Sequence, residues 1–221
     1  MRTSAHENMV KQQLRCSAVL EPRVLDVLGK VPRERFVPPP YRALAFADTN
    51  IPLRSNDRPG DRWTMMRPVV EGRLLQALEI AGHETVLEIG TGSGYLTACL
   101  ANLAQYVTSI DISEEQLAAA QETLASVGVK NSELLIQDVF QRTENLEYDA
   151  IVVNGSLPEY DSRFENWLRV GGRAFMVVGE LPMMEALLIR RVGIAEWTRD
   201  SLFETVLPPL VHASRRAAFT F

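Results

Sequence analysis

The chain has 221 residues, of which 46% are hydrophobic and 23% are charged, as in an ordinary globular protein with one main core. Its net charge of -5 excludes nucleic acid as a general partner, because phosphate binding needs a basic surface. No apolar run approaches the length of a membrane span, and the first residues do not resemble a signal peptide. Cys16 and Cys99 lack metal-ligand spacing, so we expect no metal site and two buried free thiols. From the lack of a membrane span and of a signal peptide, we expect no membrane contact and a cytoplasmic location.

Residues 1–70 differ from the rest of the chain, because short amphipathic helices and proline-rich turns replace the regular alternation that follows. Apolar residues at helical spacing predict a first helix, and Pro22 opens a second. The polar stretch Arg54 to Arg62 is typical of a mobile lid loop. We therefore expect a helical and lid subdomain over residues 1–70 and a larger domain over residues 71–221.

A strand, a glycine loop and a helix follow one another in the middle of the chain. Thr85–Ile89 is a run of apolar and β-branched residues that predicts a buried strand. Gly90, Gly92 and Gly94 then permit a sharp turn and the close approach of a ligand. Helical spacing resumes over Tyr95–Leu103, and this order of elements is typical of a nucleotide-binding site.

The residues around this loop indicate S-adenosylmethionine rather than a dinucleotide. A dinucleotide loop has a small residue at its sixth position, where this chain has Tyr95. The carboxylate of Glu88 would repel phosphates and attract a sulfonium, by about 4 kcal/mol at about 4 Å and a dielectric of about 20 before desolvation. Asp111 ends the next predicted strand, where an acid binds ribose hydroxyls. The predicted cofactor residues here are Glu88, Gly90, Thr91, Gly92, Gly94, Asp111 and Ile112.

From Thr85 onward, strands and helices alternate, which predicts a Rossmann-like, doubly wound, mostly parallel α/β sheet. Asp138 and Val139 follow the third predicted strand at the carboxyl edge, where ligands bind in such sheets. Asp138 would accept a hydrogen bond from an adenine amino group, and a plain turn-forming aspartate is the alternative. The later elements are predicted as a strand over 148–153 ending at Asn154, a helix end over 168–172, and strands over 173–178, 186–192 and 203–207.

Several short motifs occur in one order along most of the chain. They read MVKQQLR, VLDVLGKVPRERFVP, ALAFAD, VLEIGTGSGY, YDAIVVNGSLPE, LRVGGRAFMVVG and LPPL. In this order the chain resembles the protein-L-isoaspartate O-methyltransferase family. The resemblance implies a class I methyltransferase fold, S-adenosyl-L-methionine as cofactor, and methyl transfer to isoaspartyl carboxylates in damaged proteins. We expect a monomer or a small homo-oligomer that needs no general base, because a carboxylate is already ionised at neutral pH.

The segment before the glycine loop departs from this family. Where the family pattern reads close to Gly-x-Gly-Gln-Thr-Ile-Ser-x-Pro, this chain has GDRWTMMRP over residues 60–68. The resemblance places Thr64 and Met66 at the catalytic position, with Met66 in place of the serine. A thioether cannot donate a hydrogen bond to a substrate carboxylate as a hydroxyl can.

The substitution leaves three functional outcomes open. Arg62 or Arg67 supplies a charge-assisted contact to the carboxylate and the family reaction is kept. Alternatively, Trp63, Met65 and Met66 line an apolar pocket for another protein or small-molecule acceptor. In the third outcome the protein binds S-adenosylmethionine without turnover. Simple core filling by the two methionines is an equal alternative to any of these roles.

Overall fold

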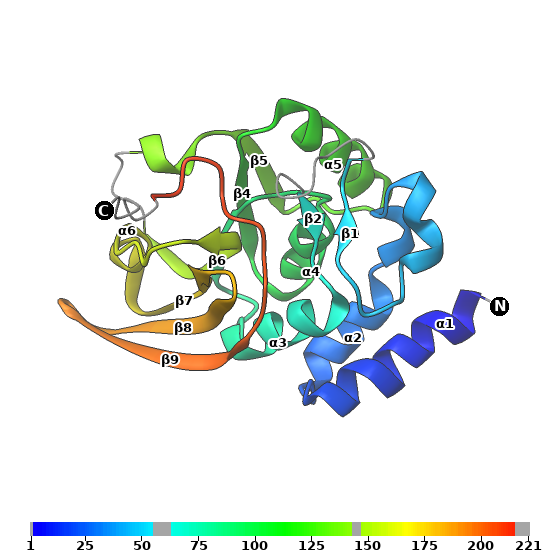
Figure 1. The fold of residues 1–221 in the computed structure, drawn as a ribbon, viewed down its shortest axis with the longest axis horizontal. Coiled ribbons are helices and arrows are strands. Elements are labelled where there is room, and N and C mark those ends of the chain that lie inside the picture. The colour runs from blue at the N-terminus through cyan, green and yellow to red at the C-terminus, as the bar shows by residue number, and fades with distance from the viewer. Residues whose placement is uncertain (1, 55–62, 143–146, 215–221) are drawn as a thin grey trace.

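The computed structural model describes residues 2–54, 63–142 and 147–214, with the backbone alone over residues 2–4. In this part of the chain, seven strands form one sheet in the order β5-β4-β3-β6-β7-β8-β9, with helices packed against it (Figure 1). The strands β5, β4, β3, β6 and β7 are parallel, and β8 and β9 are antiparallel to their neighbours. This topology confirms the predicted Rossmann-like fold.

The elements have the following bounds. The α-helices are α1 (Arg2–Asn8), α2 (Pro22–Lys30), α3 (Pro68–Leu78), α4 (Tyr95–Leu103), α5 (Glu114–Ser126) and α6 (Arg163–Asn166). The shorter helical turns are η1 (Met9–Leu14), η2 (Arg15–Ser17), η3 (Arg33–Arg35), η4 (Pro39–Leu44) and η5 (Val139–Gln141). The strands are β1 (Ile51–Pro52), β2 (Thr64–Met65), β3 (Thr85–Ile89), β4 (Tyr106–Asp111), β5 (Ser132–Ile136), β6 (Tyr148–Leu157), β7 (Leu168–Glu180), β8 (Met183–Gly193) and β9 (Glu196–Glu204).

Local sequence explains where the central elements begin. Proline occupies the first turn of α2 and of α3, where its missing N–H group costs nothing and its fixed φ suits a helix. The Ser113 hydroxyl accepts a hydrogen bond from the Gln116 N–H at 3.3 Å and caps α5. Along β3, Val86 packs into the core on one face of the sheet and Leu87 into the core on the other, as in a strand buried on both sides.

Two predicted elements near the end of the chain were wrong. The segment 168–172, expected to close a helix, is the start of β7, and the helix before it is the four-residue α6. Gly172 permits a close strand contact, because a Cβ there would lie 3.0 Å from the Asp149 carbonyl oxygen. The strand predicted over 203–207 overlaps β9 only at residues 203 and 204, because β9 runs from Glu196 to Glu204 and its mostly polar, exposed residues give no apolar signal.

The amino-terminal residues share one apolar core with the sheet. Leu14 and Leu28 are fully buried in the same cluster as Val86 of β3 and Leu100 of α4. The proposed division into residues 1–70 and 71–221 stays a prediction, and residues 55–62 of the predicted lid lie outside the described part. No helix in the part that the structure describes is long and apolar enough to cross a membrane.

The two cysteines differ in their surroundings. Cys99 is buried in α4 as expected, and burial raises the pKa of its thiol well above the usual range, which makes it unreactive. Cys16 lies in the short turn η2 and is exposed, so the expectation that both thiols are buried was wrong. The turn ends at Ala18, whose φ of 64° lies in the left-handed region.

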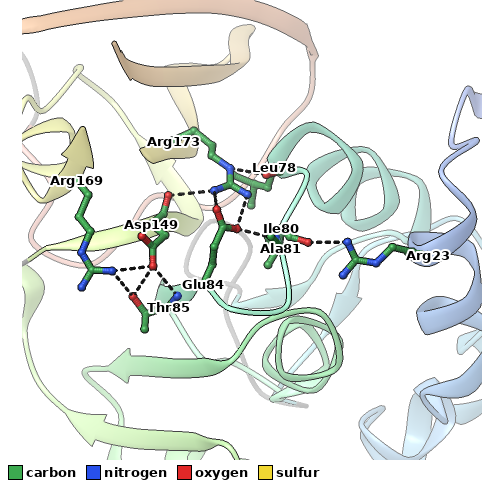
Figure 2. Close-up of polar contacts among 9 residues, drawn as sticks. All are labelled: Arg23, Leu78, Ile80, Ala81, Glu84, Thr85, Asp149, Arg169 and Arg173. Carbon is green, nitrogen blue, oxygen red and sulfur yellow. Dashed lines mark hydrogen bonds and ion pairs between the residues drawn. The ribbon is translucent and has the colours of Figure 1, made fainter. Parts of the chain in front are cut away.

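A polar network ties the amino-terminal ends of the parallel strands together (Figure 2). Arg173 of β7 forms a bidentate ion pair with Glu84, in which Nη2 donates to Oε2 at 2.7 Å. Next to this pair, the Asp149 carboxylate of β6 accepts hydrogen bonds from the Thr85 N–H at 2.8 Å and from Arg169 at 2.8 Å. The network therefore joins β3, β6 and β7 at the edge of the sheet opposite to the strand carboxyl ends.

Both carboxyl groups of this network ionise more readily than usual. Burial opposes ionisation of Glu84, but hydrogen bonds from Arg173 and from the Ala81 N–H outweigh it and lower the pKa. In the same way, burial of Asp149 is outweighed by the Thr85 and Arg169 hydrogen bonds, and its pKa is also lowered. A lowered folded-state pKa contributes stability above the unfolded-state value, and this stability is lost as the pH falls through the folded-state pKa.

We predict that Glu84→Gln lowers the free energy of unfolding at pH 7 by about 1–3 kcal/mol, because Arg173 is left buried without its charged partner. The difference from the parent should shrink as the pH falls below the usual glutamate pKa of 4.5. Urea denaturation at pH 7 and at lower pH measures both effects. Glu147→Gln is the matched control, because Glu147 is 75% exposed and lies 4.0 Å from Arg169. Equal losses in the two variants would show that the network does not stabilise the sheet.

Candidate functional site

A cavity lies at the carboxyl ends of the parallel strands. This is the edge at which ligands bind in open α/β sheets. Its wall comes from the β1–β2 ribbon, the glycine loop, the ends of β4, β5 and β6, and a segment after β9. The lining residues are Leu53, Trp63, Thr64, Ile89, Gly90, Gly92, Ile110, Asp111, Ile112, Gln137, Asp138, Val139, Asn154, Gly155 and 207–211.

The glycine loop passes close to its neighbours in a conformation that favours glycine. Gly90 has a φ of 93°, and a Cβ there would lie 2.9 Å from the carbonyl oxygen of Asn154. The Asp111 carboxylate holds the other side of the loop, since it accepts hydrogen bonds from the Gly92 N–H at 3.1 Å and the Ser113 N–H at 2.9 Å. Gly90, Gly92, Asp111 and Ile112, four of the predicted cofactor residues, all line the cavity.

Asp138 and Val139 line the cavity at the end of β5. The Asp138 carboxylate accepts hydrogen bonds from the Phe140 N–H at 2.9 Å and the Gln141 amide at 3.0 Å, and it contacts His212 Nδ1 at 2.8 Å. Burial opposes its ionisation, but the contact with His212 and the Phe140 bond outweigh it and lower the pKa. Asp138 therefore both forms the turn and presents a carboxylate to the cavity, so the two interpretations of this residue are compatible.

A segment after β9, residues 207–211, closes one side of the cavity. It runs back to β6 (red in Figure 1), where the Ser156 N–H donates to the Pro208 carbonyl at 2.8 Å. The Leu210 N–H donates to the Ser156 carbonyl at 2.9 Å, and the Ser156 hydroxyl donates to the Leu207 carbonyl at 2.9 Å. In the sequence, the LPPL motif served only as one of the motifs that support the family resemblance. Its place in the cavity wall was not predicted.

The β1–β2 ribbon supplies the opposite wall. The Leu53 N–H donates to the Trp63 carbonyl at 2.9 Å, and the Leu53 side chain lies 3.2 Å from where a Gly92 Cβ would be. The Arg54 guanidinium lies 4.3 Å from the centre of the Trp63 ring and donates to Ser113 at 3.1 Å. Next to them, the Thr64 hydroxyl is buried and has no hydrogen-bond partner among the described residues. A buried hydroxyl without a partner, on a cavity wall, is suited to bind a ligand.

Four predicted site residues do not line the cavity. Glu88 is fully buried behind the loop, where Oε2 accepts hydrogen bonds from Thr97 at 2.5 Å and Ser109 at 2.7 Å. The Thr91 hydroxyl contacts Ser109 at 2.7 Å. Gly94 packs against α5 and Met66 is 2% exposed in the core. The structure therefore corrects the expectation that the Glu88 carboxylate meets a sulfonium directly.

Comparison with known proteins agrees with this geometry. The model of the family "Protein-L-isoaspartate(D-aspartate) O-methyltransferase (PCMT)" matches residues 4–214. A protein-L-isoaspartate O-methyltransferase of Synechococcus sp. (strain JA-2-3B'a(2-13)) is 36% identical over 215 residues, which are 94% of this chain and 86% of the relative. One from Rhodopseudomonas palustris is 34% identical over 207 residues, 93% and 92% of the two chains. The chain belongs to this family.

The fold is that of solved members of the protein-L-isoaspartate O-methyltransferase family. A Plasmodium falciparum protein of that description, crystallised in complex with S-adenosyl-L-homocysteine, superposes with a TM-score of 0.76. The alignment covers 93% of this chain and 97% of that chain at 19% sequence identity.

The described residues Trp63 to Arg67 bear on two of the alternatives that the sequence raised. Met65 and Met66 are 4% and 2% exposed and belong to the core, so of the expected apolar pocket only Trp63 lines the cavity. Arg67 lies 3.9 Å from Asp48 and does not line the cavity, and Arg62 lies outside the described residues. In the described part of the wall there is no lysine or arginine.

Other members of the wall were not predicted as site residues. Gln137 and Asn154 lie at the carboxyl ends of predicted strands, at the same edge as Asp111, and this position was the signal that could have identified them. Leu53 gave no signal, because its place depends on how the ribbon folds over the glycine loop.

We predict that Glu88→Gln makes the protein more stable at high pH and leaves it nearly unchanged at pH 5. Burial raises the pKa of the Glu88 carboxyl to about 8, and hydrogen bonds from Thr97 and Ser109 oppose this only in part. A raised folded-state pKa gives stability that is complete below the unfolded-state value and is lost as the pH rises through about 8. The neutral amide removes this loss.

Free energies of unfolding at pH 5, 7 and 9 check the prediction, with a gain at pH 9 of at least about 1 kcal/mol, the equivalent of one pKa unit. Glu114→Gln, on the exposed side of α5, should show no such trend. A Glu88→Gln variant less stable than the parent at pH 9 would mean that the carboxylate is ionised and needed in the fold.

Proposed function

We propose that this protein transfers a methyl group from S-adenosyl-L-methionine to the free carboxylate of isoaspartyl residues in proteins and peptides. The observation that carries the proposal is that one cavity joins the cofactor residues Asp111 and Asp138 to the unpartnered hydroxyl of Thr64. Membership of the protein-L-isoaspartate O-methyltransferase family supports both the reaction and the cofactor.

The cavity suits the chemistry of S-adenosylmethionine. In its described wall the charged residues are two acids, which would repel the phosphates of a dinucleotide and favour a cationic, phosphate-free nucleoside. Asp111 would hold the ribose hydroxyls, and Asp138 with Val139 would hold the adenine. Gly90 and Gly92 leave room for the backbone to approach the rest of the molecule.

When bound, S-adenosylmethionine supplies an electrophilic methyl group, and an ionised carboxylate accepts it without a general base. The protein then has to orient the carboxylate and exclude water. Thr64 donates a hydrogen bond to the carboxylate in place of the missing serine. Trp63, Leu53 and residues 207–211 form apolar walls that keep water away.

The test is transfer of labelled methyl from S-adenosylmethionine to an isoaspartyl peptide, against the same peptide with a normal aspartate, scored as base-labile ester. Selective labelling of the isoaspartyl peptide supports the proposed function. Labelling of other acceptors in a cell extract, but not of the peptide, would point to a different substrate. Tight cofactor binding without any turnover would point to a binding protein.

For the acceptor side, we predict that Thr64→Val lowers kcat/KM for the isoaspartyl peptide about tenfold, the equivalent of one lost hydrogen bond to a charged group. Valine keeps the shape and removes only the hydroxyl. Affinity for S-adenosylhomocysteine, measured by calorimetry, should stay within about twofold of the parent. Thr198→Val, at an exposed position of β9, is the control. An unchanged kcat/KM in Thr64→Val would remove Thr64 from the acceptor site.

On the cofactor side, Asp111→Ala should weaken S-adenosylmethionine binding at least several-fold, because it removes the ribose partner and the acceptor that holds the Gly92 N–H. Asp111→Asn keeps one oxygen acceptor, and we expect a smaller loss. Calorimetric titration of the three proteins measures this. Equal affinity in the parent and Asp111→Ala would place the ribose elsewhere.

The proposed function requires isoaspartyl-containing proteins or peptides as partners. A cytoplasmic location and a monomeric or small oligomeric state stay predictions from the sequence.

A further inference from the structure

We propose that Asn154 is a second donor to the acceptor carboxylate, and that Asn154 and Thr64 together form a neutral donor pair in place of the family serine. The inference rests on the proposed function and goes beyond it by naming a residue that neither the motif pattern nor the cofactor chemistry assigned. Both residues line the one cavity.

The fold fixes Asn154 in the wall. It follows Val153, which pairs with Ile89 of β3 in the centre of the sheet, so its backbone is held at the carboxyl edge beside the glycine loop. The Asn154 amide donates to the Gly90 carbonyl at 2.8 Å. Only the nitrogen end of an amide can donate, so this bond also fixes which way the side chain is turned.

The amide keeps further hydrogen-bonding capacity. A side-chain amide has two N–H donors, and the bond to Gly90 uses one of them. The second N–H has no partner among the described residues, and the side chain is only partly buried in the cavity wall. A fixed donor with an unused N–H beside a ligand cavity is suited to bind an oxygen of the ligand.

Asn154 and the β1–β2 ribbon that carries Thr64 both contact the same short loop. Asn154 binds Gly90 directly. In the ribbon, Thr64 pairs with Pro52, and Leu53, the residue after Pro52, packs against Gly92. The loop that would hold the methyl donor is therefore contacted by the residue with the unused N–H and by the ribbon that carries the unpartnered hydroxyl.

Neutral donors suit the transfer better than a cation would. The carboxylate loses its negative charge as its oxygen bonds to the methyl group, while the bond from methyl to sulfur breaks and the electron pair stays on sulfur. An arginine would stabilise the charged carboxylate before transfer more than in the transition state, and this would raise the barrier. A neutral donor meets the carboxylate with a dipole and not with a full charge, so it orients the carboxylate with a smaller penalty of this kind. The described wall contains no lysine or arginine, in keeping with this need.

The test uses Asn154→Ala and Asn154→Asp with two probes, an isoaspartyl peptide and the same peptide with the free α-carboxylate of the isoaspartyl residue replaced by a carboxamide. Calorimetry on protein saturated with S-adenosylhomocysteine gives the affinity for each probe, and S-adenosylhomocysteine is titrated separately. Asn166→Ala and Asn166→Asp, at an exposed position of α6, repeat the same changes away from the cavity.

We expect the parent to prefer the carboxylate peptide over its carboxamide twin. Asn154→Ala should reduce this preference about tenfold and raise KM for methyl transfer by a similar factor, with affinity for S-adenosylhomocysteine within about twofold of the parent. Asn154→Asp should abolish the preference, because it places a negative charge where the carboxylate binds. The Asn166 variants should match the parent.

Two results would overturn the assignment while the proposed function stands. In one, the parent methylates the isoaspartyl peptide and Asn154→Ala keeps the full preference. In the other, Asn154→Ala weakens S-adenosylhomocysteine and peptide equally, so that its role is confined to holding Gly90. A parent that neither methylates the peptide nor prefers the carboxylate refutes the proposed function itself, and the donor pair with it.

Discussion

A buried ion pair between Arg33 and Glu71 is the constraint on which the functional edge of this protein depends. Arg33 is fully buried, and besides Glu71 it binds the Ala45 carbonyl at 2.9 Å and the Met66 carbonyl at 2.6 Å. Its guanidinium also lies 4.6 Å from the centre of the Tyr95 ring, at the first turn of α4. One cation thus joins the amino-terminal segment, the end of the β1–β2 ribbon and the helix that follows the glycine loop. Removal of either partner from such a pair leaves an uncompensated buried charge, so the arrangement is strongly specified.

The Arg33–Glu71 pair explains how the segment with Thr64 and Met66 differs from the family pattern without loss of the cavity. The Met66 backbone is fixed by Arg33 and its side chain fills the core, whereas Thr64, two residues earlier, reaches the wall. The cavity that results has two acids, Asp111 and Asp138, near the ends of β4 and β5, and neutral residues on the β1–β2 ribbon. Such a division suits the proposed reaction, in which a sulfonium cation meets a carboxylate and both charges disappear.

Local patterns predicted the elements whose position depends on neighbours in sequence. The strand, loop and helix over residues 85–103 have the predicted bounds, and Asp111 and Asp138 lie in the cavity because parallel strands bring their carboxyl ends to one edge. Glu88 was misplaced because a sequence shows that a residue is at a strand end but not which neighbours enclose it. The hydroxyls of Thr97 and Ser109, from two other elements, hold its carboxyl behind the loop. The wall formed by residues 207–211 depends on long-range contacts with β6, which no local pattern reports.

That wall has a consequence for how the protein is made. Ribosomal synthesis runs from the amino terminus, so the glycine loop and the ends of β4 and β5 emerge well before residues 207–211 do. A nascent chain that ends at β6 contains Asp111 and Asp138 but lacks the residues to which Ser156 is hydrogen-bonded. The last part of the cavity wall to be synthesised is thus the segment that these hydrogen bonds hold in place.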